Sequence, residues 1–146
     1  MVFSGLFQHM LGMTTRAVRR KMDEVVRLID STSLHLAGIG TQWARFSADV
    51  CGAKAHVIYD PELSCPVYHA ISAANVNDIV AAKAMPIEPG ATYVFDLGYY
   101  DYAWWAELDR ACCRIVTRFK TNTPLGQARD MPLQPGSSVL SDRIVV

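Results

Sequence analysis

Residues 93–120 constrain the fold more than any other part of the chain. They begin with three apolar residues typical of a buried strand, at 93–95, followed by Asp96 and a glycine at Gly98. A helix that carries two tryptophans and a leucine is predicted next, and a second apolar strand follows over 114–119. A strand, helix and strand in this order indicate a parallel pair of strands in an α/β sheet.

Two aspartates occupy similar settings in the sequence. Asp96 follows the predicted strand at 93–95, and Asp30 follows the apolar run at 25–29. An acid at the carboxyl end of a core strand faces a crevice while the strand holds it in place, although aspartate is also a preferred helix N-cap. The two acids are 66 positions apart, so they share a site only if their strands are neighbours in one sheet. Such a pair would bind a hard cation such as Mg²⁺.

Composition indicates one domain with a hydrophobic core, because 51% of the 146 residues are hydrophobic. The 14 basic and 14 acidic residues cancel, which excludes a global attraction to nucleic acid or anionic lipid. The charges are unevenly spread, however, since residues 110–129 contain five basic side chains and no acid. This is either a solvated face or a set of phosphate contacts, for which the candidates are Lys54, Arg118 and Lys120.

The rest of the chain supplies the other elements of a mixed α/β sheet. Polar and apolar residues alternate over 54–59 and 67–72 around an Asp-Pro turn, which predicts a hairpin. A helix is expected to start at Asn77 or Asp78 and to end before Pro86. Residues 1–24 have helical spacing of apolar side chains and are predicted to form a helical segment before a domain at 25–146. The predicted fold class is therefore α/β, with a mixed sheet flanked by helices.

Cysteine, histidine and tryptophan give no independent signal of a metal or redox site. The cysteines lack the spacing of zinc and redox motifs and are predicted to be reduced packing residues in a cytosolic protein: Cys51, Cys65, Cys112 and Cys113. Three histidines are expected to be hydrogen-bonded and partly buried, not ligands: His35, His56 and His69. Three tryptophans either stack on unpaired bases or, as we favour, fill the core: Trp43, Trp104 and Trp105.

Five short motifs follow one another in a fixed order: IDST at 29–32, WARF at 43–46, GAKAH at 52–56, DLGYYDYAWW at 96–105 and VTRFKTN at 116–122. Together they resemble the catalytic core of bacterial insertion-sequence transposases of the DDE class, in the group with a Tyr-Arg-Glu-Lys signature. The resemblance covers residues 25–146.

The resemblance implies an RNase H-like fold in which two aspartates and one glutamate surround two Mg²⁺ or Mn²⁺ ions. By position, Asp30 is similar to the first of these acids and Asp96 to the second. The implied activity is metal-dependent cleavage and strand transfer of DNA during transposition. The implied partners are DNA, as transposon ends and target, and a second copy or an intact transposase, in the bacterial cytoplasm and without a membrane.

Two departures from the family pattern change this expectation. Leu97 stands where such sequences commonly have arginine, and no glutamate follows residue 107. Asp142, near the end, is interpreted as a residue at the start of a strand. We therefore predict a fragment truncated at both ends, with a sheet incomplete at its C-terminus and little or no strand-transfer activity. The alternatives are a non-catalytic DNA-binding or interfering product, and a non-functional remnant of a transposable element.

Overall fold

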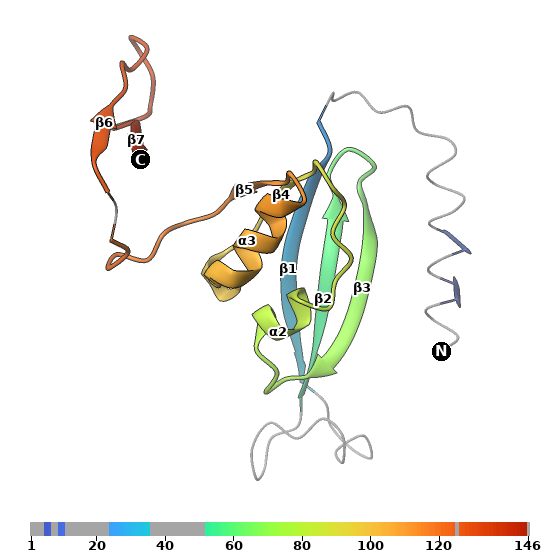
Figure 1. Ribbon diagram of the computed structural model, residues 1–146. Helices are drawn as coiled ribbons and strands as arrows, with labels where there is room; N and C mark the ends of the chain where they lie inside the picture. Colours follow the sequence, from blue (N-terminus) through green and yellow to red (C-terminus); the bar gives the residue numbers. More distant parts are fainter. Residues whose placement is uncertain (1–4, 7–8, 11–23, 36–51, 125, 146) are drawn as a thin grey trace.

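The computed structural model describes residues 5–6, 9–10, 24–35, 52–124 and 126–145. In these ranges a five-stranded sheet has the strand order β3-β2-β1-β4-β5, and a separate two-stranded sheet pairs β6 with β7 (Figure 1). Helices α2 and α3 pack near the five-stranded sheet (Figure 1). This confirms the predicted mixed α/β sheet and is consistent with an RNase H-like organisation.

One side of the five-stranded sheet is antiparallel. Strands β1 (Val26–His35), β2 (Gly52–Asp60) and β3 (Cys65–Ala73) follow one another as neighbours. The predicted hairpin is confirmed, because β2 and β3 pair along their length with one irregularity after Ile58. The other side is parallel, since β4 pairs with β1 and β5 pairs with β4.

The prediction that the first strand ends at Asp30 is wrong. Strand β1 continues through Asp30 to His35, because β2 pairs with it from Leu28 onward and supplies ladder hydrogen bonds to this half of the strand. Only the parallel pairing with β4 stops early, at Leu28. Residues 36–51, which include the predicted motif at 43–46, lie outside the described residues.

Strand β4 and the helices lie close to their predicted positions. Helix α2 (Asp78–Ala82) begins after Asn77, whose side chain makes no capping hydrogen bond. Strand β4 (Thr92–Val94) is followed by a short 3₁₀ helix, η1 (Leu97–Tyr99), and by α3 (Tyr102–Arg110). Strand β5 (Arg114–Val116) is shorter than the predicted strand.

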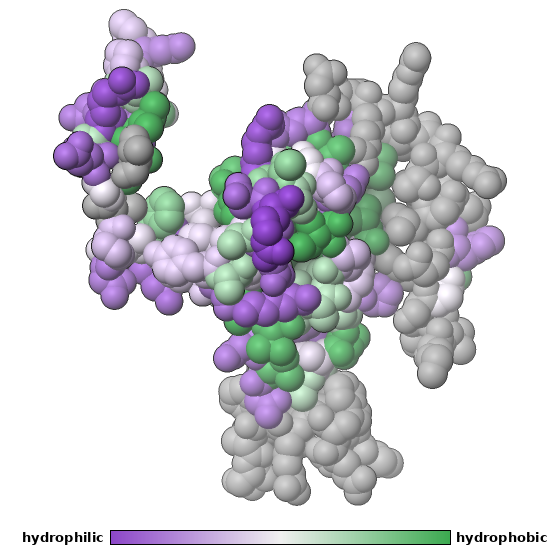
Figure 2. All heavy atoms as spheres, in the orientation of Figure 1, coloured by the Kyte–Doolittle hydropathy of each residue, from purple (hydrophilic) through white to green (hydrophobic). Residues whose placement is uncertain are grey.

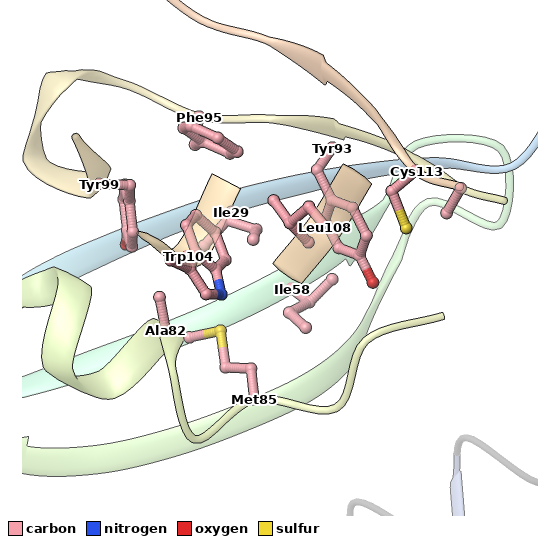
Figure 3. Packing of buried hydrophobic residues seen from close by; sticks show 11 residues of the cluster. Ile29, Ile58, Ala82, Met85, Tyr93, Phe95, Tyr99, Trp104, Leu108 and Cys113 are labelled. Carbon is pink, nitrogen blue, oxygen red and sulfur yellow. The ribbon is translucent and has the colours of Figure 1, made fainter. Parts of the chain in front are cut away.

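The core lies between the sheet and the helices η1 and α3 (Figure 3). Trp104 and Leu108 on α3 are 2% and 0% exposed, which confirms the core position predicted for Trp104. The Trp104 ring packs against Phe95 with centroids 5.1 Å apart. Trp105 is only partly buried, and Trp43 lies outside the described residues. The Asp96 turn thus follows directly on Phe95, a buried residue of the aromatic core.

A buried ion-pair network joins the start of β1 to two loops. Arg27 is 5% exposed and donates to Asp60 Oδ2 at 2.6 Å and to Glu88 Oε2 at 2.6 Å and 3.0 Å. The other Asp60 oxygen accepts hydrogen bonds from the backbone amides of Glu62 and Leu63, at 2.9 Å and 3.0 Å. Arg27 therefore ties β1 to the turn after β2 and to the loop before β4.

The C-terminal hairpin stands apart from the five-stranded sheet in Figures 1 and 2. It consists of β6 (Ala128–Asp130) and β7 (Arg143–Val145). The interpretation of Asp142 as a residue at the start of a strand is confirmed, although that strand pairs with β6 and not with the larger sheet. Within the described ranges, no helix combines the length and the apolar character needed to cross a bilayer.

The cysteine prediction is confirmed only in part. Cys65, Cys112 and Cys113 are free thiols, and Cys51 lies outside the described residues. Cys113 is buried, as predicted, but Cys112 is exposed and does not pack. The reason is local: Cys112 follows α3 with a φ of 57°, in the left-handed conformation that ends the helix.

Candidate carboxylate site

Asp30 on β1 and Asp96 after β4 follow the same end of one strand pairing. The parallel pairing of β1 with β4 ends at Leu28 and Val94, and each aspartate comes two residues later. The backbone at Asp96 is still extended, with φ of −91° and ψ of −173°. The sheet thus carries both acids past the same end of the β1–β4 ladder, although they are 66 positions apart in the sequence.

Both aspartates are exposed, and each accepts a hydrogen bond from a neighbouring backbone amide. Asp30 Oδ1 accepts from the Ser31 N–H at 2.8 Å, and Asp96 Oδ1 accepts from the Gly98 N–H at 2.8 Å. Asp96 therefore caps η1, whereas the cap of α3 is Asp101, whose Oδ1 accepts from the Trp104 N–H at 2.8 Å. Exposed carboxylate oxygens of this kind fit the hard-oxygen preference of Mg²⁺ and Mn²⁺.

Asp78 lies beside the pair, and we missed it from the sequence. It is the first residue of α2, and its Oδ1 accepts hydrogen bonds from Ser31 Oγ at 2.8 Å and from Lys54 Nζ at 3.1 Å. The sequence pattern at Asp78 is that of a helix start, and this local pattern gives no sign of the contacts with Ser31 and Lys54. The available signal was its place on the crossover helix that leads into β4, the strand before Asp96.

The Tyr99 phenol lies within electrostatic reach of three acids. Its side chain is 1% exposed, and burial raises its pKa above the ordinary value. The Ser31 hydroxyl opposes this rise in the pKa, whereas the charges of three carboxylates add to it: Asp78, Asp30 and Asp96. The three acids thus lie within electrostatic reach of one phenol.

The described residues do not supply a third ligand at metal-binding distance. Among them, no three acidic, histidine or cysteine side chains are grouped closely enough to hold an ion. Two of the glutamates have arginine partners elsewhere, since Glu24 pairs with Arg114 and Glu88 with Arg27. The pair Asp30 and Asp96 is therefore an incomplete ligand set in the described part of the chain.

The three predicted phosphate contacts have different surroundings. The Lys54 side chain is 18% exposed, and its ammonium also donates to the Val76 carbonyl at 3.1 Å. Arg118 and Lys120 are exposed after β5, and Lys120 Nζ lies 4.6 Å from the centre of the Tyr100 ring. Only Arg118 and Lys120 therefore present their charges openly to solvent.

His56 is a buried histidine in contact with this region. Its side chain is 0% exposed and its Nε2 shares a hydrogen bond with Ser72 Oγ at 2.8 Å, which confirms the prediction of a buried, hydrogen-bonded histidine. Burial lowers the pKa of His56 below its ordinary value of 6.5, the Asp78 charge opposes this, and the Lys54 charge adds to it. The unfolded chain therefore binds a proton more readily at this residue than the folded chain does.

We expect the free energy of unfolding to fall as the pH drops below 6.5 toward the folded-state pKa of His56. In His56→Gln this part of the pH dependence should be absent. Urea unfolding at pH 7.5 and 5.5 measures the difference for both chains. Equal losses in both chains, or an NMR titration of His56 at or above 6.5, would contradict the assignment.

Comparison with known proteins gives two matches. The family model described as "Transposase DDE domain" matches residues 21–143. A protein from Sinorhizobium fredii named "Putative transposase y4zB" is 38% identical over 148 residues, covering 99% of this chain and 41% of that protein. The chain thus spans well under half the length of this relative. No solved structure matches the chain.

Proposed function

The chain belongs to the transposase DDE domain family, and from this premise we propose that Asp30 and Asp96 are the first two acids of a metal-dependent transposase site. The observation that carries the proposal is the place of each aspartate two residues beyond Leu28 and Val94, the last pair of the parallel β1–β4 ladder. In this proposal the RNase H-like domain spans 25–146, and residues 1–24 form a helical segment that precedes it.

The proposed chemistry is cleavage and strand transfer of DNA in the bacterial cytoplasm. Asp30 and Asp96 would hold Mg²⁺ or Mn²⁺, which stabilises the charge that develops on the oxygens of a phosphodiester. The sheet fixes the spacing of the two carboxylates, and the packing of Phe95 against Trp104 holds the turn at Asp96. Arg118 and Lys120 would contact the phosphates of transposon ends or target DNA, with a smaller contribution from the ion-paired Lys54.

Substitution of either aspartate tests the metal site. We expect Asp30→Asn and Asp96→Asn each to abolish the Mn²⁺ binding that calorimetry detects, because each variant leaves a single carboxylate. The matched control is Asp142→Asn, an exposed aspartate before β7, which should bind Mn²⁺ as the parent chain does. Unchanged Mn²⁺ binding in Asp30→Asn and Asp96→Asn would show that neither acid binds the metal and that both have structural roles.

We further propose that the 146-residue chain alone has little or no activity on DNA. With two acids in place of three, the position of a cation is less well fixed, and a misplacement of about 1 Å costs on the order of a hundredfold in rate. Incubation with supercoiled plasmid and Mg²⁺ should produce no more nicked DNA than the Asp96→Asn variant produces. Nicking at rates usual for transposases, lost in Asp96→Asn, would contradict this.

A second candidate function is a non-catalytic product that binds DNA or pairs with an intact transposase. The exposed charges of Arg118 and Lys120, together with the incomplete ligand set among the described residues, favour it. It predicts DNA binding that weakens steeply with salt and is not accompanied by cleavage.

A further inference from the structure

We propose that Asp78 is a positioning residue for the Asp30 and Asp96 pair, acting as a third charge beside the cation and not as its direct ligand. The inference rests on the proposed metal site. It assigns a role to a side chain that lies 18 residues before Asp96 in the sequence, at the start of α2.

The two oxygens of Asp78 are used differently. Oδ1 is fixed by Ser31 Oγ at 2.8 Å and by Lys54 Nζ at 3.1 Å, so that α2 is tied to β1 and β2. Ser31 is the residue next to Asp30, and its own N–H is donated to Asp30 Oδ1 at 2.8 Å. A displacement of Asp78 is therefore transmitted to the backbone that holds Asp30.

The second oxygen faces the Asp96 turn. A methyl group added to Gly98 would lie 3.2 Å from Asp78 Oδ2 and 3.0 Å from Asp96 Oδ1. The two carboxylates thus approach the same side of Gly98, whose N–H is donated to Asp96 Oδ1. A Cβ at this position would push the two carboxylate oxygens aside by a few tenths of an ångström, which favours the glycine two residues after Asp96.

A buried and unsatisfied group also faces Asp78. His56 is 0% exposed, and its Nδ1 has no hydrogen-bond partner among the described residues. This nitrogen lies 3.9 Å from Asp78 Oδ1, beyond hydrogen-bonding distance. A buried polar atom left unpaired is costly, so the space between His56 and Asp78 is a polar one in which the described side chains leave a hydrogen bond unmade.

A cation held by Asp30 and Asp96 would interact with Asp78 through charge. The three carboxylates all act on the Tyr99 phenol, their like charges repel, and the Lys54 ammonium offsets only one of them. A divalent ion would neutralise the negative charge that remains. Asp78 would strengthen its binding through charge and by holding Ser31 and the Gly98 turn, as groups behind the direct ligands of metal sites do.

The test is a titration of the 146-residue chain with Mn²⁺, in which electron paramagnetic resonance measures free Mn²⁺. Asp78→Asn keeps the shape of the side chain and removes its charge, and we expect it to raise the Kd for Mn²⁺ about tenfold or more. The matched control is Asp109→Asn, an exposed aspartate on α3, which should leave the Kd unchanged. Thermal melting by circular dichroism should show both variants folded at the temperature of the titration.

The outcomes separate this inference from the proposed function. An unchanged Kd in Asp78→Asn, with binding still lost in Asp96→Asn, would overturn the role of Asp78 and leave the metal site standing. No Mn²⁺ binding by the parent chain would overturn both. If Asp78→Asn does not fold, Ser31→Ala replaces it, because it removes the hydrogen bond to Asp78 Oδ1 and keeps all three charges. A Kd raised severalfold in Ser31→Ala supports the inference, and an unchanged Kd overturns it.

Discussion

Replacement of Arg27 by methionine is expected to lower the free energy of unfolding by about 3 to 5 kcal/mol, because removal of one partner leaves a buried charge uncompensated. Asp60, which is 2% exposed, would lose its guanidinium partner at 2.6 Å and keep the two amide donors of its turn. Glu88 is less affected, since its side chain is 46% exposed. Urea unfolding monitored by circular dichroism measures the loss.

The matched control for Arg27→Met is Arg143→Met. Arg143 also pairs with an aspartate, Asp130, at 2.8 Å, but the two side chains are 61% and 79% exposed. An exposed pair of this kind contributes less than about 1 kcal/mol. Equal losses of unfolding free energy in Arg27→Met and Arg143→Met would contradict the view that burial makes the Arg27 ion pairs important for stability.

Replacement of Trp104 by alanine is expected to lower the free energy of unfolding by about 3 to 5 kcal/mol. The indole is 2% exposed and lies among aromatic rings, with the centroid of Phe95 at 5.1 Å and that of Tyr99 at 6.4 Å. Its removal leaves a cavity under the turn that carries Asp96. The free energy of unfolding in urea should fall accordingly, and the folded remainder should bind Mn²⁺ less tightly.

The neighbouring Trp105 is the matched control for Trp104→Ala. It is partly buried, and it packs mainly against Tyr100, Tyr102 and Phe119 near the surface. Trp105→Ala should therefore destabilise the chain less than Trp104→Ala does. An equal or larger loss in Trp105→Ala would show that the centre of the core has been misplaced.

The sequence predicted those features that have a local pattern. The apolar run before Asp96 and the glycine after it gave the strand and turn, and the alternation around Asp60 gave the hairpin. For Asp30 the predicted strand end was wrong, because the apolar run shows where burial ends and not where pairing with β2 ends. Exposed β1 residues continue the strand without a hydrophobic signal.

Long-range partners could not be predicted in this way. Arg27 and Asp60 are 33 positions apart, and Asp78 and Ser31 are 47 apart. In the sequence each of these residues has a local explanation. Arg27 and Ser31 are polar residues in a strand, Asp60 is a turn residue, and Asp78 starts a helix. Their contacts follow from the strand order β2-β1-β4, which no single segment encodes.

The most direct measurement is the amide NMR spectrum of the 146-residue chain with substoichiometric Mn²⁺, whose paramagnetism broadens nearby resonances. If Asp30 and Asp96 share one cation, the amides of Ser31 and Gly98 should broaden together at the same Mn²⁺ concentration, and neither should broaden in Asp96→Asn. Broadening of one amide without the other, or of Ser31 unchanged in Asp96→Asn, would show that the two aspartates do not form a common site.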